Sequence, residues 1–432
     1  MSTKRRIIHG IGANGFGQAV TLLIQIASVP ILINAWGIEL YGEWIILSAV
    51  PAYLVLSDIG LTSIAGNMLA LLAEERDNRQ MQTIYQSTWT MVSFLSVIIL
   101  IPVVVIVWFT DPSEMLGLTR ITGGTLNVTL LLLFLHVAMS MQTGILQLPF
   151  RALKRNPFSV AAANLIRLLE WFIATLVVLT GGKVVEFAFT FLLVRLLGNF
   201  SLWLILNRSG VSLKIGVRYA SLQTIKKLLR PSLASMCFPL GLSFTMQGFI
   251  LLIGSMLGPT AVALFSIYRT FTRVPIQLAT AINQAVWPEL SYAFGANDIN
   301  KAKKLVVKML QFGAILSVLT ALSIYFLGER AIDLWVSKAL EHNSSLLIAL
   351  TLTALIHILW QPFWVAQIAI NRHTHFALSF LFISALSLVL GWFSLVCFNL
   401  KGAGYAILLS ECLMAVAASF TFTRYFKAAQ HD

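Results

Sequence analysis

The sequence predicts an all-α protein that crosses a membrane twelve times. Its composition, its apolar stretches and the placement of its charges all point to this fold class. Of its 432 residues, 58% are hydrophobic and 11% are charged, whereas soluble domains have roughly 45–50% and about 25%. Too few polar side chains remain to cover a surface in water, so this composition excludes a soluble globular protein.

Twelve apolar stretches are each about as long as the helix that crosses a bilayer, which is roughly 20 residues. They lie near residues 11–33, 43–68, 84–108, 125–148, 158–181, 184–206, 231–257, 261–287, 305–327, 345–368, 376–398 and 403–425. The first follows Lys4, Arg5 and Arg6, as the core of a signal peptide would. Its apolar run is longer than a signal core, so we expect it to be retained as a span.

The basic residues fix the predicted orientation. With the N-terminus in the cytoplasm, the inward connections hold 21 Lys and Arg and the outward connections hold 5. Because cytoplasmic connections carry the excess of Lys and Arg, both termini are expected in the cytoplasm. The net charge of +13 is then mostly a matter of topology. It indicates no nucleic acid partner and favours contact with anionic lipid headgroups on the inner face.

The longest polar connection, residues 207–230, predicts two lobes with a cytoplasmic linker between them. Six spans precede it in an N-terminal lobe (1–206), and six follow in a C-terminal lobe (231–432). An even number of spans places both lobes the same way up. This predicts parallel repeats related by a pseudo-two-fold axis along the membrane normal.

A constant offset between the two halves supports the repeat. It places Gly37 on Gly258 and Asp77 on Asp298, and it preserves the spacing across three spans. The shared spacing, more than the identities themselves, indicates an internal repeat.

Four arginines lie near the middle of predicted spans: Arg167, Arg195, Arg269 and Arg273. Each costs about 2.5–3.5 kcal/mol at a helix centre unless it meets water or a partner. One interpretation is that they line a wet cavity between the lobes and bind an anionic group, because guanidinium suits bidentate contact with phosphate. The alternative is internal ion pairing.

Acidic residues within the spans are candidates both for that pairing and for gating or ion coupling: Asp58, Glu170 and Glu411. Glu170 is three positions after Arg167 on the same helical face, so pairing and substrate binding stay equal alternatives for Arg167. Arg269 and Arg273 have no acidic residue nearby on their own helix, which favours the cavity role.

Two predicted helices carry polar stripes. At about 100° per residue, the polar residues of 261–287 fall within an arc of roughly 80°. They are Arg269, Arg273, Gln277, Thr280 and Gln284. The stripe of 11–33 consists of Asn14, Gln18, Thr21, Gln25 and Ser28. Helices lining a shared cleft would show such stripes, but polar side chains that bind neighbouring helices would too.

No cofactor or metal is expected. Gly182-Lys183 is followed by Val184, whereas a nucleotide-binding Walker A loop needs Ser or Thr there. His136 and His357, in the fourth and tenth spans, are related by the same offset as the glycines, without further ligands at metal-site spacing. We interpret them as buried, hydrogen-bonded histidines, with proton coupling as the alternative.

Short motifs then give a family resemblance. The first half carries Trp36-Gly37, Tyr41-Gly42-Glu43-Trp44 and Ser57-Asp58-Ile59-Gly60-Leu61. The second half carries Leu257-Gly258-Pro259, Phe265-Ser266, Arg269, Arg273, Pro275 and Trp287-Pro288-Glu289-Leu290-Ser291. In these motifs and in its span layout, the chain resembles the polysaccharide transporter family. These are lipid-linked oligosaccharide flippases of the multidrug, oligosaccharidyl-lipid and polysaccharide (MOP) exporter superfamily.

The resemblance implies a two-lobed alternating-access fold in the bacterial inner membrane. The implied substrate is an undecaprenyl-pyrophosphate-linked sugar repeat of O-antigen, capsule or enterobacterial common antigen type. Glycan polymerases and other assembly proteins are implied partners. By resemblance, substrate binding carries over to Arg195, Arg269 and Arg273, while Asp58 matches an aspartate of the family's second span.

Two other functions are alternatives to a flippase. A drug exporter of the same superfamily typically moves cations, which fits poorly with a cavity that holds more arginine than carboxylate. A membrane glycan polymerase or ligase usually presents catalytic groups on a sizeable outward loop, and the longest outward connections here are only those near 109–124 and 328–344. We therefore predict a transporter and not an enzyme.

Overall fold

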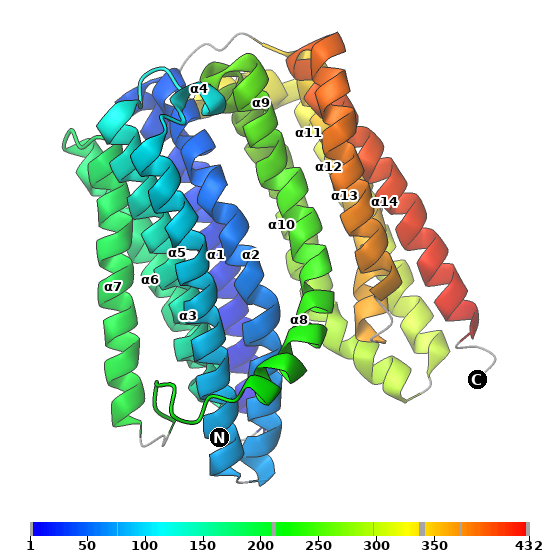
Figure 1. The fold of residues 1–432 in the computed structure, drawn as a ribbon. Helices are drawn as coiled ribbons and strands as arrows, with labels where there is room; N and C mark the ends of the chain where they lie inside the picture. The colour runs from blue at the N-terminus through cyan, green and yellow to red at the C-terminus, as the bar shows by residue number, and fades with distance from the viewer. Residues whose placement is uncertain are drawn as a thin grey trace. The chain divides into compact units, whose positions relative to one another are not determined.

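The computed structural model describes residues 3–75, 77–209, 213–296, 298–336, 342–370 and 374–428. These residues form helices and connections without any strand (Figure 1). The helices of the first half are α1 (Thr3–Trp36), α2 (Ile38–Glu75), α3 (Asn78–Phe109), α4 (Ser113–Leu116), α5 (Gly123–Ala152), α6 (Asn156–Leu179) and α7 (Val184–Arg208). Those of the second half are α8 (Leu222–Ser243), a π-helical turn (Phe244–Gly248), α9 (Phe249–Leu257), α10 (Pro259–Gly295), α11 (Ile299–Val336), α12 (Ser344–Ala369), α13 (Thr374–Phe398) and α14 (Leu400–Ala428).

The all-α, multi-pass class predicted from the sequence is confirmed. Ten helices of the described part are long and apolar enough to cross a membrane. Every predicted span coincides with a helix of the structure. The spans near 43–68 and 261–287 are the long helices α2 and α10, and the span near 231–257 is the continuous run of α8, the π-helical turn and α9.

The chain divides into two compact units, which are described separately. Unit 1 comprises residues 1–24 and 35–239, and unit 2 comprises residues 25–34 and 240–432. Helix α1 therefore contributes to both units, and so does α8.

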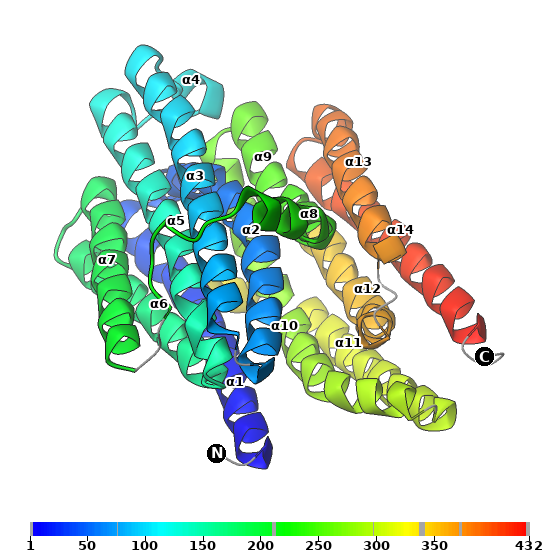
Figure 2. The same ribbon diagram turned by 60° about the horizontal axis from the view of Figure 1, so that its bottom comes forward.

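Within unit 1, α5 is the central helix and packs against α2, α3, α6 and α7 (Figure 2). Its buried Met141 and Ile145 meet Ala65 of α2 and Tyr85 of α3 in one apolar cluster, which also takes in Leu213 from the connection after α7. Within unit 2, α12 packs against α10, α11 and α14. In unit 1, the packing of helices around α5 brings the polar residues described below into contact. In unit 2, the packing of helices around α12 does the same.

The internal repeat recurs in backbone conformation. Gly37, between α1 and α2, has φ +83°, and Gly258, between α9 and α10, has φ +81°. Only glycine adopts this left-handed region without strain. Asp77 and Asp298 each accept a hydrogen bond of 2.9 Å from the backbone N–H three positions later, at the start of α3 and of α11. Residues related by the offset between the halves therefore have the same local structure.

Candidate functional site

The carboxylate of Glu170 on α6 is the centre of the polar site in unit 1. Its side chain is 1% exposed. Nη2 of Arg195, on α7, donates to Oε2 across 2.6 Å, and Nε of Arg195 lies 2.5 Å from Oε1. Nε2 of His136, on α5, lies 3.3 Å from Oε1. Three neighbouring helices thus meet in one ion-paired cluster.

Arg195 is consequently a paired arginine. It is 9% exposed, and both contacts to Glu170 balance its charge. Of the two interpretations drawn from the sequence, internal pairing describes Arg195, and this geometry gives no support to a direct contact with substrate. Glu170 lies on another helix, far from Arg195 along the chain, so helical spacing did not identify it as the partner.

Arg167 lies one helical turn before Glu170 on α6, yet it is not the direct partner of that carboxylate. Its side chain is exposed, and Nη1 donates to Oγ1 of Thr21 on α1 across 3.1 Å. It interacts electrostatically with Glu170, which attracts it, and with Arg195, which repels it. Because Glu170 binds Arg195, the guanidinium of Arg167 bonds to the hydroxyl of Thr21 instead.

Two buried residues, Asn199 of α7 and Thr143 of α5, were not identified from the sequence. Asn199 lies one turn beyond Arg195 on α7, and its Nδ2 donates to the carbonyl of Met139 across 2.8 Å. Its Oδ1 accepts from Oγ1 of Thr143 across 2.7 Å. Asn199 lies four positions after Arg195 and so shares its helical face, and this spacing could have identified Asn199 from the sequence.

In unit 2, the π-helical turn positions Arg269 and Arg273. Nη1 of Arg269 donates to the carbonyl of Met246 across 2.7 Å, and Nη1 of Arg273 lies 3.0 Å from the sulfur of Met246. A π-turn disrupts the regular i to i+4 pattern of the helix, so its carbonyls are open to side-chain donors. The guanidinium of Arg269 also lies 5.1 Å from the ring centroid of Phe265, a cation–π contact. Both arginines are half-buried.

Glu411 on α14 is the acidic centre of unit 2. Its Oε2 accepts from Nε1 of Trp360 across 2.7 Å, and its Oε1 lies 3.2 Å from Nδ1 of His357. Both partners come from α12. Glu411 also interacts electrostatically with Arg273. Unit 2 therefore holds a carboxylate, a histidine and an arginine, as unit 1 does.

The two histidines are hydrogen-bonded, as the sequence predicted. His136 and His357 occupy corresponding positions of the repeat, and each meets a glutamate from another helix of its own unit. The glutamates are not related by the repeat: Glu170 comes from the fifth span of its half and Glu411 from the sixth. The repeat thus preserves the histidine position, whereas the acid reaches it from a different helix in each unit.

Parts of the two polar stripes bind neighbouring helices. Nε2 of Gln277 donates to Oε1 of Gln25, in the part of α1 that belongs to unit 2. Thr280 accepts from Nε2 of Gln361 on α12 across 2.7 Å, and Gln361 in turn accepts from Asn283 across 2.8 Å. Interhelical hydrogen bonding therefore accounts for the middle of the α10 stripe.

The remaining stripe residues differ in exposure. Asn14 and Gln284 are exposed, and Gln18 is half-buried. The side chain of Asp58, a candidate for gating or ion coupling, lies outside the described residues. Among the described residues, no three His, Cys, Asp or Glu side chains come together as a metal site requires.

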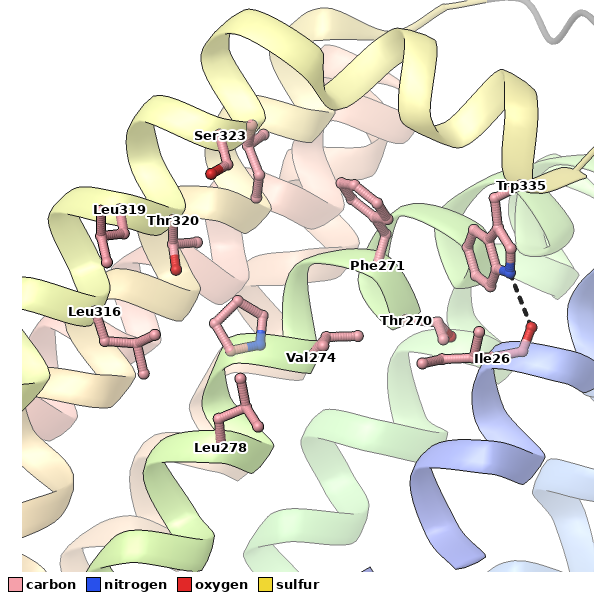
Figure 3. A pocket seen from close by; sticks show the side chains of 12 residues that line it. Ile26, Thr270, Phe271, Val274, Leu278, Leu316, Leu319, Thr320, Ser323 and Trp335 are labelled. Atoms are coloured by element: carbon pink, nitrogen blue, oxygen red, sulfur yellow. Dashed lines mark hydrogen bonds between the residues drawn. The ribbon is translucent and has the colours of Figure 1, made fainter. Parts of the chain in front are cut away.

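An apolar pocket of about 500 Å³ adjoins α10 within unit 2 (Figure 3). Phe271, Val274 and Leu278 of α10 line one wall, and α11 supplies the other, including Leu319. At about 100° per residue, these α10 side chains lie roughly 100–180° around the helix from Arg269 and Arg273. One helix thus presents cationic side chains on one side and the apolar pocket on roughly the opposite side.

Glu43 of the motif Tyr41-Gly42-Glu43-Trp44 has a structural role that the sequence did not reveal. Its side chain is fully buried, and its carboxylate accepts the backbone N–H groups of Thr119, Arg120 and Ile121, each across 2.7 Å. The hydroxyl of Thr119 donates as well, across 2.9 Å. One carboxylate therefore fixes the connection between α4 and α5.

Comparison with known proteins decides the family. Residues 52–345 match the model of a family described as "Polysaccharide biosynthesis protein". The chain belongs to this family. A comparison with curated proteins found no match. The polysaccharide biosynthesis family is in keeping with the motifs from which the polysaccharide transporters were predicted.

Solved structures show the same fold. A multidrug-resistance MATE transporter of the MOP superfamily, in an inward-facing conformation, has a TM-score of 0.75 at 14% identity, over 95% of this chain and 96% of that one. The lipid II flippase MurJ, in an inward closed conformation, has a TM-score of 0.73 at 14% identity, over 96% and 87%. A MOP transporter from Pyrococcus furiosus, whose binding pocket is described as reversed in polarity, has a TM-score of 0.61 at 16% identity, over 99% and 96%. This polysaccharide biosynthesis protein is thus a multi-pass membrane protein with the MOP transporter fold, as predicted.

Proposed function

We propose that the protein is a flippase in the bacterial inner membrane, with both termini in the cytoplasm. Its substrate is an undecaprenyl-pyrophosphate-linked oligosaccharide repeat of O-antigen, capsule or enterobacterial common antigen type. By alternating access it moves this lipid-linked glycan from the cytoplasmic to the periplasmic leaflet. Membership of the polysaccharide biosynthesis family and the MOP fold support this proposal.

The observation that carries the proposal is a pair of arginines within the membrane span of α10, on a helix that also walls an apolar pocket. Arg269 and Arg273 are held by Met246 of the π-helical turn, and Phe271, Val274 and Leu278 line the pocket on roughly the opposite side of α10. A polyprenyl-pyrophosphate has the matching chemistry, because its diphosphate suits guanidinium groups and its chain suits an apolar groove. The diphosphate then never has to enter hydrocarbon without partners.

Of the two arginines in the middle of the unit 1 spans, Arg167 is the one that remains open to an anion. It is exposed and its hydrogen bond is to a neutral hydroxyl, on Thr21. Arg195 supports it indirectly, because pairing with Glu170 removes the carboxylate that Arg167 would otherwise bind. Within unit 1, the proposed direct contact to an anionic substrate group is accordingly Arg167, with Arg195 as a positioning residue. Within unit 2, the proposed contacts are Arg269 and Arg273.

Glu411 is the proposed site of gating or ion coupling. Its carboxylate contacts His357 and Trp360 and interacts electrostatically with Arg273, so its charge acts on a proposed substrate contact. Glu170 is less suited to this role, since both of its carboxylate oxygens contact Arg195.

A drug or cation exporter of the MOP superfamily is the second candidate, because a MATE transporter shares the fold. A strain in which the gene is deleted distinguishes the two candidate functions. A flippase deletion accumulates the complete lipid-linked repeat and lacks surface glycan, whereas an exporter deletion changes drug susceptibility and leaves the glycan normal.

The site itself is tested by Arg269→Ala with Arg273→Ala in the complemented deletion strain. We expect surface glycan to be lost while the protein is still inserted at wild-type level. Arg330→Ala is the matched control, since it removes an exposed arginine of α11 outside the α10 stripe. Normal glycan in the double variant would contradict the proposed role of these arginines.

A further inference from the structure

A second cavity lies in unit 1 where α3 begins. Its lining is mostly polar and charged, unlike that of the apolar pocket. It has a volume of about 830 Å³. The first turns of α3 form one wall and the connection between α7 and α8 forms the other. The side chains that line it include Arg79, Gln82, Gln86, Lys214, Arg218 and Tyr219.

Amide side chains of α3 fix the shape of this cavity. Gln82 makes two hydrogen bonds with the backbone of Lys214, accepting its N–H across 3.0 Å and donating to its carbonyl across 2.6 Å. Gln86 is 3% exposed and accepts the N–H of Tyr219 across 2.6 Å. Leu213, just before the cavity, is buried in the core of unit 1. The connection therefore forms a defined wall of the cavity.

The cavity is cationic. Arg79, Lys214 and Arg218 line it with exposed side chains, and no acidic residue is among its described lining residues. The nearest acid in sequence, Asp77, caps α3 by accepting the N–H of Gln80 across 2.9 Å. Three positive charges therefore converge on one hollow, which suits a phosphate group.

The same connection exposes apolar side chains. Val217 is 62% exposed and Leu222 is 67% exposed, and Ile215 and Tyr219 are exposed as well. Exposed apolar groups interleaved with Lys and Arg are unfavourable in water but are typical of segments at the membrane interface. Helix α3 is long and apolar enough to span the membrane, so its first turn lies at a membrane surface. The charge distribution predicts that this surface is the cytoplasmic one.

We propose that this cavity binds the phosphate headgroup of an anionic phospholipid of the adjacent leaflet. Arg79, Lys214 and Arg218 contact the headgroup, while Val217 and Leu222 reach into the acyl region. This site is separate from the proposed path of the transported glycan and goes beyond the proposed function. The exposed apolar side chains favour a lipid over a soluble phosphate, because a soluble phosphate would make no apolar contacts.

Native mass spectrometry of the purified full-length protein tests the site. The protein in detergent is titrated with phosphatidylglycerol and, separately, with zwitterionic phosphatidylcholine. We expect the tightest binding step to be specific for phosphatidylglycerol. The triple variant Arg79→Ala, Lys214→Ala, Arg218→Ala should weaken that step on the order of a hundredfold, given the contribution of each basic residue near an anionic lipid.

The matched control is Lys303→Ala, Lys304→Ala, Lys308→Ala, which removes three exposed charges from the corresponding turns of α11. This control should retain the tight step. Equal loss in both triple variants, or equal binding of the two lipids by the wild type, would overturn the proposal. Melting curves confirm that each variant is folded.

A third variant and a soluble ligand separate the two sources of phosphate. Val217→Ser with Leu222→Ser should weaken phosphatidylglycerol at least tenfold, and inorganic phosphate should not displace the lipid at equal concentration. If inorganic phosphate binds as tightly and the apolar variant has no effect, the site takes a soluble anion and the lipid proposal is wrong. None of these measurements requires transport, so the result stands apart from the test of the flippase.

Discussion

The indole N–H of Trp335 donates a hydrogen bond to the backbone carbonyl of Ile26 across 2.8 Å (Figure 3). Ile26 is four positions before Pro30, which lies inside α1. Because proline has no backbone N–H, the carbonyl of Ile26 lacks its donor within the helix. Trp335, near the end of α11, supplies it. A tryptophan far along the chain thus supplies the hydrogen bond that a proline in the first span removes, within unit 2.

This relationship predicts that the effect of Trp335→Phe depends on Pro30. The substitution keeps an aromatic ring but removes the donor, so we expect a loss of about 1 kcal/mol of stability. Pro30→Ala restores a backbone donor to the carbonyl, and in that background Trp335→Phe should cost clearly less. Thermal unfolding in detergent measures all four forms. Equal costs in both backgrounds would contradict the interaction, and Trp108→Phe, at an exposed tryptophan, is the control.

The pairing of Arg195 with Glu170 predicts a large effect on stability. Arg195→Ala or Glu170→Ala leaves one charge buried without its partner, at a cost of about 3–5 kcal/mol. Replacing both residues by apolar side chains, Glu170→Leu with Arg195→Met, should recover much of that loss. Expression level and melting temperature in detergent report the result. If Arg195→Ala is as stable as the wild type and yet inactive, Arg195 contacts substrate directly.

Arg167 is expected to behave in the opposite way. Its side chain is exposed and its hydrogen bond is to a neutral hydroxyl, so Arg167→Ala should change stability by less than about 1 kcal/mol. The surface glycan should fall strongly, and Arg167→Lys should restore it only in part, because lysine lacks the bidentate geometry. Comparing glycan level with protein level in the same cells separates the two effects.

Glu43 is expected to be essential for the α4–α5 connection. Glu43→Gln removes the charge and replaces one of the two accepting oxygens with an NH2 donor, which faces at least one backbone N–H, so we expect a loss of about 3 kcal/mol. Glu39→Gln is the matched control: Glu39 pairs with Arg120 in an exposed salt bridge, which contributes at most about 1 kcal/mol. Limited proteolysis between residues 113 and 122 should speed up in the first variant only. Resistance in both would argue against this role.

The carboxylate of Glu411 is expected to matter for coupling more than for folding. Glu411→Gln keeps an oxygen that can accept from Trp360 but removes the negative charge. In proteoliposomes, we expect glycan movement by this variant to lose any response to an imposed proton gradient. A matched variant, Glu289→Gln, removes an exposed acid of unit 2 and should respond as the wild type does. An unchanged response in Glu411→Gln would assign coupling elsewhere.

The fold could be predicted from sequence because its determinants are local. A bilayer demands about 20 apolar residues per helix, and the twelve predicted spans coincide with helices for that reason. The repeat was visible because Gly37 and Gly258 are both needed where the backbone turns left-handed. Such constraints act on a residue regardless of its distant neighbours.

The site was harder to predict, because its partners are distant in sequence. Helical periodicity compares residues on one helix, and it therefore offered Glu170 as a partner only for Arg167, with substrate binding as the equal alternative, whereas the structure pairs Glu170 with Arg195 on α7. The role of Glu43 depends on a connection that follows much later in the chain, beyond α3. The sequence places Gln277 and Thr280 on one stripe of α10, but only packing shows that both bind other helices.

The π-helical turn Phe244–Gly248 is equivalent to one extra residue inserted into an α-helix. Deleting a single residue there would restore a regular helix and rotate α8 relative to α9 by about 100°. Met246 would then point away from Arg269 and Arg273, although neither arginine had been changed. The length of this turn, and not only its side chains, sets where the positive charges of unit 2 are held.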